Sequence, residues 1–426
     1  MSADNIDLQL LLTQHEELKT QYSAFQAKGL KLDMTRGKPS PAQLDLANGL
    51  LTILGPNDYL SDSGVDCRNY GGLSGIAEAK TLFSDYLEVK SEETFVGGNT
   101  SLGLMHDIIA RFMSHGAVDS PTPWSKLETV KFLCPAPGYD RHFAICEHFG
   151  IEMITINLLE NGDPDFDLIE KLVANDDSIK GMWFVPKYGN PSGLSISDEG
   201  VDRLASMHFS AQDFTIMWDN AYHVHHLTAE KVRIKNLLNA CKEAGNANRV
   251  FIIGSTSKVS FAGAGIAAIG ASVDNIQWLE KHCSVQTIGS DKINQLRHVR
   301  FFKDINGIEQ HMLKHAQILA PKFEAVDKVL TENLAGKNIA TWSSPKGGYF
   351  INLDVSDNCA KKVVALAKDA GVIMTSAGAT FPYNNDPRDR NIRIAPSLPA
   401  LEEITQAMQI LCVCIKLATI EVLANK

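Results

Sequence analysis

The chain has 426 residues, of which 44% are hydrophobic and 21% charged, and its formal net charge is −10. A chain of this length can bury a large core in more than one domain, and its composition is ordinary for a globular protein. The acidic balance argues against nucleic acid or an anionic membrane as a main partner, although a local basic pocket could still bind an anion.

The sequence also argues against a membrane span and against secretion. We find no apolar run of the roughly 20 residues that span a bilayer. The stretch MSADNIDLQLLL carries acidic groups where a signal peptide would carry basic ones. The eight cysteines are scattered, with no CxxC pair, so a disulfide framework is not expected in a chain this long. We therefore expect a cytoplasmic protein.

The predicted elements alternate between helix and strand through most of the chain. Apolar residues at helical spacing predict a first helix over residues 4–28, which Gly29 ends. Further helices are predicted near residues 76–88, 101–115, 139–149, 165–174 and 197–208. Short β-rich runs are predicted at residues 131–134, 153–159, 181–186, 215–220, 250–255 and 266–271. This alternation is typical of βαβ units, so we expect an α/β fold with a mostly parallel sheet flanked by helices.

The last third of the chain has a different pattern. A long helix is predicted over 308–335, followed by strands at 347–354, 372–378 and 391–396 and a final helix from about residue 400. We interpret this part as a smaller α/β domain. The expected division is an N-terminal helix and arm over 1–45, which packs with the small domain, a large domain over 46–305 and a small domain over 306–426.

Chemically useful residues fall where predicted strands end, and open parallel sheets bind ligands at those ends. Lys258 follows VFIIGS, and a desolvated lysine there could form a Schiff base, although most such lysines are solvated. Asp219 ends TIMWDN and could hold a pyridinium N–H, or simply cap a helix. Asn190, in the turn sequence NPSG, could reach a cofactor oxygen, or only form the turn.

Other candidates lie at loops and helix starts. Gly98-Asn99-Thr100 opens a helix, whose free N–H groups could bind a phosphate. Tyr139 follows another strand and could stack on a flat cofactor, and Tyr70 lies in the Gly-rich loop RNYGGLSG. Arg393, in NIRIAPS, has the fork geometry that binds a carboxylate. Each feature alone is more often structural than functional.

The order of these motifs resembles that of the fold-type I aminotransferases of class I/II, from about residue 30 to the end. The segments TRGKPSPAQLDL, CPAPGYDRHF and FPYNNDPRDRNIRIAPSLP are similar to those of the bacterial type Ic aspartate aminotransferases, which are related to the aminotransferase-like domain of MocR-type regulators. The resemblance implies an aspartate aminotransferase-like fold, with a large domain that binds pyridoxal 5′-phosphate (PLP), and a homodimer with shared active sites.

The resemblance also implies a role for each matching residue. Lys258 would attach PLP covalently and move the Cα proton, Asp219 would pair with the pyridine nitrogen, and Tyr222 and Asn190 would bind the ring oxygen. Arg393 would bind the substrate α-carboxylate. The remaining expected cofactor contacts are ring stacking by Tyr139 and phosphate binding by Gly98, Asn99, Thr100 and Ser255, with Tyr70 reaching the phosphate of the neighbouring subunit.

Two departures from the family pattern stand out. The family usually has a phosphate-binding arginine eight positions after the lysine, where this chain has Ile266. Lys292 and Arg297 are candidate replacements, from the same or the partner subunit. No motif identifies a group for the side-chain carboxylate of a dicarboxylic substrate. Arg36, beside Gly37 in TRGKP, is a candidate for substrate binding, and ordinary salt-bridge use is the alternative for all three cations.

Three rival motifs are weaker. Ser255-x-x-Lys258 matches the nucleophile motif of serine β-lactamases, but it ends a strand and no Lys-Thr-Gly follows. Gly263-x-Gly265-x-x-Ala268 resembles a dinucleotide fingerprint but opens an apolar run that reads as a strand, with no clear helix after it. Three histidines (His223, His225 and His226) could suggest zinc, but no further ligand cluster is evident, so no metal site is expected.

The expected reaction is therefore L-aspartate with 2-oxoglutarate, giving oxaloacetate and L-glutamate by a ping-pong route through Lys258. Transamination of alanine, aromatic amino acids or kynurenine is the alternative, because the aspartate assignment depends on the subgroup resemblance alone. A non-catalytic module that senses PLP or an amino acid is the rival of a different class. The MocR-type regulators carry a DNA-binding domain, for which the roughly 30 residues before the shared region leave no room.

Overall fold

The computed structural model describes residues 13–424, and its central feature is a seven-stranded sheet in the order β2-β8-β7-β6-β5-β3-β4. Strands β3 to β7 run parallel, whereas β8 is antiparallel to both of its neighbours. The mostly parallel sheet predicted from the sequence is thus confirmed. Its strands are β2 (Thr94–Val96), β3 (Lys131–Ala136), β4 (Glu152–Asn157), β5 (Ile179–Phe184), β6 (Thr215–Asp219), β7 (Val250–Ser255) and β8 (Ala267–Ala271).

Helices cover both faces of this sheet, which explains why every residue of β5, β6 and β7 is buried. On β6, Ile216 and Trp218 belong to one hydrophobic cluster, whereas Met217, between them, belongs to another. One face packs against α4 (Ala77–Leu87), α7 (Phe166–Val173), α8 (Asp198–Ser206), α9 (Leu237–Glu243) and α11 (Lys292–Phe302). The other packs against α5 (Ser101–His115), α6 (Asp140–Phe149) and α10 (Val273–Cys283).

Helix α10 corrects one expectation. We expected no clear helix after the apolar run at 266–271, yet α10 begins two residues after β8. Ser272 begins it by accepting a hydrogen bond from the Asn275 N–H, the usual device of an N-cap serine. The Gly263–Ala268 motif nevertheless leads into a strand, so the Gly-rich turn between a strand and a helix that binds dinucleotides is not formed there.

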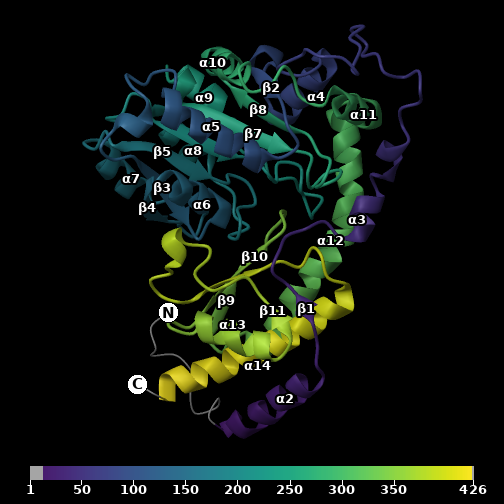
Figure 1. Cartoon of the computed structure of the whole chain (residues 1–426). Helices are drawn as coiled ribbons and strands as arrows, with labels where there is room; N and C mark the ends of the chain where they lie inside the picture. The colour runs from purple at the N-terminus through teal and green to yellow at the C-terminus, as the bar shows by residue number, and fades with distance from the viewer. Residues whose placement is uncertain (1–12, 425–426) are drawn as a thin grey trace.

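A second, smaller lobe lies below the large sheet in Figure 1. It contains an antiparallel sheet in the order β12-β10-β9, and a parallel pair of β1 with β11. Leu18, Leu32 and Met34 share its hydrophobic cluster with residues from the last hundred positions. The elements are α2 (His15–Ala27), β1 (Leu32–Asp33), α12 (Ile305–Leu334), β9 (Ala340–Trp342), β10 (Ile351–Val355), α13 (Ala360–Asp369), β11 (Val372–Ile373), β12 (Asn391–Ile394) and α14 (Leu401–Ala424).

Short elements complete the chain. They are α3 (Pro41–Asp45) and the 3-10 helices η2 (Asn48–Leu51), η3 (Ser91–Glu93), η4 (Trp124–Lys126), η5 (Ala247–Arg249) and η6 (Pro382–Asn384). The predicted first helix is observed from His15 to Ala27, and its predicted residues 4–12 lie outside the described part of the chain. The exact domain boundaries remain a prediction.

Helix α12 joins the two lobes. Near its start, Ile308 and Met312 pack in the core of the large lobe, and further along Phe323 and Val326 pack in the core of the small lobe. Figure 1 shows this helix running down one side of the molecule from the upper lobe to the lower. The space between the lobes is therefore closed on that side by a continuous helix.

Helix α14 corrects a second expectation, because we found no apolar run long enough to span a bilayer. Within the described residues, the segment Leu401–Leu423 is long and apolar enough to do so by composition. In the structure, 67% of its most apolar window is buried, against α12, α13 and α2. Because α14 is buried among other helices, its high hydropathy is that of a core helix.

Candidate active site

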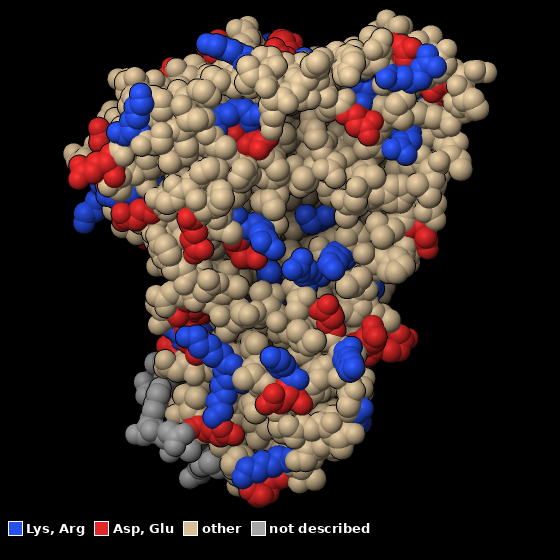
Figure 2. Space-filling model, viewed as in Figure 1, with Lys and Arg blue, Asp and Glu red and all other residues tan. Residues whose placement is uncertain are grey.

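A cavity of about 470 Å³ lies between the lobes, where the ends of β5, β6 and β7 face the small lobe. Eight of the predicted site residues line it, namely Arg36, Gly37, Tyr139, Asn190, Asp219, Tyr222, Lys258 and Arg393. Lysine and arginine side chains gather at the hollow between the lobes in Figure 2. A chain with a net negative charge thus concentrates positive charge at one cavity, which suits an anionic ligand.

Lys258 lies just beyond β7, and its side chain faces the cavity. Its Nζ is 5.0 Å from the centre of the Tyr222 ring. Burial lowers the pKa of the Lys258 amine, and the negative charge of Asp219 opposes part of this shift. A lysine with a lowered pKa has more of its neutral, nucleophilic form at physiological pH, which imine formation and proton transfer both require.

Asp219 ends β6 and is 2% exposed. Its Oδ2 lies 3.1 Å from Nε2 of His142, whereas its Oδ1 is buried without a hydrogen-bond partner. A buried carboxylate oxygen without a donor costs free energy, so this oxygen is open to a donor from a bound molecule. His142, which we did not predict as a site residue, lies in α6, and its ring stacks on Trp183 at 4.6 Å.

Tyr222 and Tyr139 border the same space. Tyr222 is 3% exposed, and burial raises the pKa of its phenol well above the usual value. Burial also raises the pKa of Tyr139 to about 12. Both phenols therefore stay protonated, and the Tyr222 hydroxyl is a hydrogen-bond donor to any acceptor beside Lys258.

Arg393 projects from β12 of the small lobe and contacts residues of both lobes. Its Nη1 donates to Asp140 Oδ1 at 2.9 Å and to Asn190 Oδ1 at 3.2 Å, and its Nη2 donates to Thr375 Oγ1 at 3.3 Å. Its guanidinium carbon lies 5.0 Å from the centre of the Phe350 ring. Its Nε is buried without a partner, so the guanidinium keeps a donor for an incoming carboxylate.

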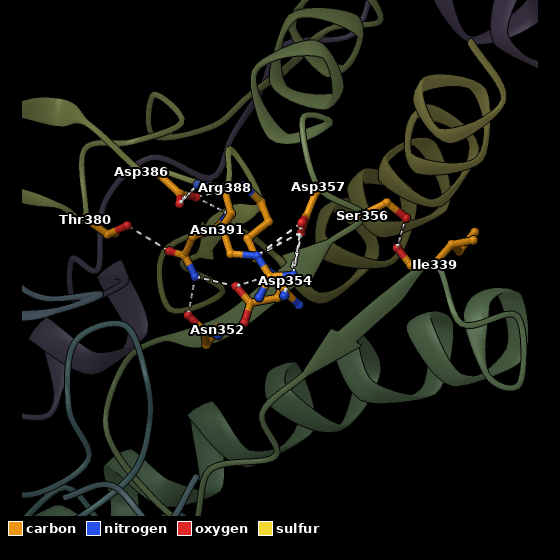
Figure 3. A network of polar contacts seen from close by, with 10 residues as sticks. Ile339, Asn352, Asp354, Ser356, Asp357, Thr380, Asp386, Arg388 and Asn391 are labelled. Atoms are coloured by element: carbon orange, nitrogen blue, oxygen red, sulfur yellow. Dashed lines mark hydrogen bonds and ion pairs between the residues drawn. The ribbon is translucent and has the colours of Figure 1, made fainter. Parts of the chain in front are cut away.

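A polar network holds the strand that carries Arg393 (Figure 3). The Asn391 side chain donates to Asn352 Oδ1 at 2.7 Å and to Asp354 Oδ1 at 2.8 Å, and its own oxygen accepts from Thr380 Oγ1. The Thr380 carbonyl accepts the Gly138 N–H at 2.7 Å. The network therefore links β12 to the turn that carries Tyr139 in the large lobe.

Gly37 is required by close packing. A Cβ atom at this position would lie 2.5 Å from Cζ of Phe350, well inside van der Waals contact. Phe350 in turn lies against Arg393. The glycine thus lets the TRGKP segment pack on Phe350, next to Arg393.

The predicted phosphate-binding residues lie next to the Lys258 turn. The Ser257 hydroxyl donates to the Asn99 carbonyl at 3.2 Å and accepts from Ser255 Oγ at 3.2 Å. Gly98 has φ +71°, a conformation that favours glycine, and α5 starts at Ser101. Gly98, Asn99 and Thr100 line a neighbouring cavity of about 380 Å³, whereas Ser101, the next residue of this helix start, lines the main one.

The candidate replacements for the missing arginine are engaged elsewhere. Ile266 is buried in the core, as an aliphatic residue should be. The Lys292 amine donates to the backbone carbonyls of Asn69 and Gly71, each at 2.6 Å, and Arg297 donates to Asn294. Neither side chain lines the main cavity in this chain. Lys292 thus holds the loop of Tyr70, whose own side chain is 84% exposed, and a role of either cation in the partner's site remains a prediction.

The three adjacent histidines have separate surroundings. His226 Nδ1 lies 2.7 Å from the Tyr188 hydroxyl, His225 Nε2 lies 3.4 Å from the Lys258 carbonyl, and His223 lies near Glu88. Within residues 13–424, no group of three or more His, Cys, Asp or Glu side chains is placed to hold a metal ion.

Comparisons with known proteins identify the family of this chain. A family model described as aspartate amino-transferase matches residues 8–426. A candidate aminotransferase of Mycolicibacterium smegmatis is 50% identical, with 99% of each chain covered. The aspartate aminotransferase of Corynebacterium glutamicum is 44% identical, covering 100% of this chain and 98% of its own.

Solved structures give the same result. The crystal structure of an aspartate transaminase from Corynebacterium glutamicum is 44% identical and has a TM-score of 0.96, with 99% of each chain covered. The kynurenine aminotransferase of Pyrococcus horikoshii, solved with PMP, is only 17% identical but has the same fold, with a TM-score of 0.75 over 94% of each chain. The chain therefore belongs to the aspartate aminotransferase family and is an aminotransferase.

Proposed function

We propose that this protein is a PLP-dependent aminotransferase that transfers the amino group of L-aspartate to 2-oxoglutarate, with Lys258 as the cofactor-binding lysine. The main support is that three groups line one cavity. They are Lys258 with its lowered pKa, Asp219 with a buried carboxylate oxygen that has no partner, and Arg393 with a free donor. The C. glutamicum relative, named as an aspartate aminotransferase, supports the choice of substrate.

The residues of the cavity fit PLP. The partnerless Oδ1 of Asp219 suits a protonated pyridine nitrogen, and the phenol of Tyr222 and the amide of Asn190 suit the ring oxygen. Tyr139 would cover the ring. The phosphate would lie among Gly98, Asn99, Thr100 and Ser255, at the start of α5, where free N–H groups favour an anion. When bound, PLP supplies a conjugated electron sink attached to the substrate nitrogen.

The protein's own side chains would carry the remaining chemistry. Arg393 would bind the substrate α-carboxylate through its free Nε and through donors that now contact Asp140 and Asn190. That contact would hold the Cα–H bond near Lys258. The neutral Lys258 amine would take the proton from the substrate Cα and hold it for its return, because its lowered pKa permits both steps near neutral pH.

Three further cations lining the cavity suit a second carboxylate on the substrate. Arg36, Lys38 and Arg141 border the cavity together with Arg393, and all three are exposed to solvent. We propose that Arg36 or Arg141 binds the side-chain carboxylate. Arg36→Gln and Arg141→Gln should each be compared on aspartate and on alanine. A specific loss on aspartate supports the assignment, and an equal loss on both substrates contradicts it.

We also propose that the protein acts as a homodimer in which Tyr70 enters the partner's site. Tyr70, Val285 and Ile288 are 84%, 87% and 61% exposed, and Gly289 packs directly on the backbone of Gly71 in the Tyr70 loop. These apolar side chains suit burial against a second copy. A mixture of Lys258→Ala and Tyr70→Ala subunits should regain activity, because one of its two sites would be intact. No regain on mixing would show that Tyr70 does not act in the partner.

The near-visible absorption of the purified protein tests the proposal as a whole. A cofactor band that L-aspartate converts, and that 2-oxoglutarate restores, supports both PLP and the dicarboxylic substrate. If aspartate leaves the band unchanged but alanine, an aromatic amino acid or kynurenine converts it, that amino acid is the substrate in place of aspartate. A band that no amino acid changes would favour a sensing module, and absence of any band with added PLP would overturn the role of Lys258. A cytoplasmic location remains a prediction.

A further inference from the structure

Four polar side chains that the mechanism does not use form a buried cluster behind Lys258. Gln43 and Tyr349 are fully buried, and His315 and His311 are 1% and 6% exposed. We call Gln43, His311, His315 and Tyr349 the carbonyl-binding cluster. Its members come from α3, from α12 and from the segment before β10, so three distant parts of the chain meet here.

The cluster binds the backbone of the proposed catalytic lysine. The Tyr349 hydroxyl donates to the Lys258 carbonyl at 3.4 Å, and His311 Nε2 donates to the Val259 carbonyl at 2.9 Å. The consecutive carbonyls of Lys258 and Val259 thus have side-chain donors. Both lie beyond Ser255, the last residue of β7, and outside any strand. Buried carbonyls of a turn need such partners, because no strand neighbour supplies them.

The direction of each hydrogen bond follows from the groups present. Gln43 Oε1 accepts the Ser40 N–H at 3.0 Å, so Gln43 Nε2 is the donor to Tyr349 Oη at 2.9 Å and to His315 Nδ1 at 3.1 Å. The Tyr349 proton is then left for the Lys258 carbonyl. His315 then carries its proton on Nε2, which lies 3.1 Å from His311 Nε2. Because His311 Nε2 cannot accept while it donates to Val259, the Val259 carbonyl is the acceptor for both imidazoles.

The two histidines are held neutral by burial, which lowers the pKa of His315 to about 4 and also lowers that of His311. Burial raises the pKa of the Tyr349 phenol. At neutral pH the cluster therefore adds no net charge behind the Lys258 amine, which faces Asp219 and Tyr222. Its effect on Lys258 is geometric.

We propose that Gln43, Tyr349, His315 and His311 are positioning residues that fix the backbone of Lys258 and Val259 and thereby the place of the amine relative to Asp219 and the substrate Cα. The inference rests on the proposed role of Lys258. Because His311 and His315 lie on the helix that packs in both lobes, and Tyr349 adjoins Phe350 of the cavity wall, the cluster also ties this backbone to the small lobe.

The test uses the full-length holoenzyme with a matched pair of hydroxyl deletions. Tyr349→Phe removes one donor near the Lys258 carbonyl, where His225 Nε2 also lies at 3.4 Å. The control Tyr22→Phe removes a hydroxyl that donates to the Leu366 carbonyl at 2.9 Å, in the small lobe. We expect Tyr349→Phe to lower kcat about twofold, the low end for one hydrogen bond because the contact is 3.4 Å long, with little change in KM. The pH midpoint of the cofactor absorption should shift in Tyr349→Phe and not in the control.

Each outcome decides the inference. If both variants keep the wild-type kcat and absorption midpoint, or both change equally along with Tm, the cluster is merely structural and the proposal is overturned. If Tyr349→Phe does not fold, the substitutions Gln43→Met and His315→Asn take its place with the same readouts. A wild-type protein without a cofactor band or turnover would overturn the proposed function itself, whereas an active wild type with an unaffected Tyr349→Phe overturns only the positioning role.

Discussion

The contact between His142 and Asp219 gives the most exacting prediction. His142→Phe keeps an aromatic ring stacked on Trp183 but deletes the Nε2 group that lies 3.1 Å from Asp219 Oδ2. Both side chains are 3% exposed, so water cannot replace the lost partner. One carboxylate oxygen of Asp219 already lacks a protein donor. In His142→Phe neither oxygen would have a donor, and the ionised carboxylate would be less stable.

The size of the effect follows from the same contact. A hydrogen bond to a charged group contributes about 1.5–3 kcal/mol, or about 10- to 150-fold in rate. Because 3.1 Å is near the long end for such bonds, we expect a loss of kcat/KM of about 10- to 30-fold. Steady-state kinetics with aspartate and 2-oxoglutarate measure it. His142→Gln, which keeps a donor, should recover part of the activity. An unchanged kcat/KM in His142→Phe would refute the reasoning.

Three further predictions concern the site and its support. Lys258→Ala should lose turnover by more than 1000-fold, on the order expected for a covalent catalytic residue, while its melting temperature stays near wild type; full activity would contradict the assignment. Lys292→Met should free the loop of Asn69 and Gly71. We expect sedimentation to show weaker dimerisation and calorimetry to show only a small drop in the melting temperature of the monomer. Acid should destabilise the fold, because burial lowers the pKa of His223 to about 3 and those of His298 and His315 to about 4. The unfolded chain then binds more protons below the unperturbed histidine pKa of about 6.5, so each histidine costs about 2 kcal/mol at pH 5; equal denaturant midpoints at pH 7 and pH 5 would contradict this.

Part of the site was predictable because parallel strands end at a common edge. Lys258, Asp219 and Asn190 each follow a β-rich run, and the alternation of helices and strands predicts that such ends lie together. The structure brings all three to one cavity. The family resemblance, which depended on the order of the motifs, added the late Arg393 and Tyr222.

Other features depend on contacts that periodicity does not encode. The sequence gives no sign that His142 lies over Asp219, that Asp140 pairs with Arg393 across the lobes, or that Lys292 holds the Tyr70 loop. Each contact joins side chains that are far apart in the chain. Such pairs form only where the packing of whole elements brings the polar atoms within about 3 Å.

The sequence by itself determined the fold class, most of the elements and the residues that end the central strands, because these depend on local hydrophobic spacing. We found no apolar run that would span a bilayer, although α14 is long and apolar enough to do so by composition, and its burial against α12, α13 and α2 accounts for that hydropathy. Tertiary structure also decided which donors each buried group receives. The partnerless Asp219 oxygen and the carbonyl-binding cluster arise from desolvation and close packing, which exist only once the two lobes have formed.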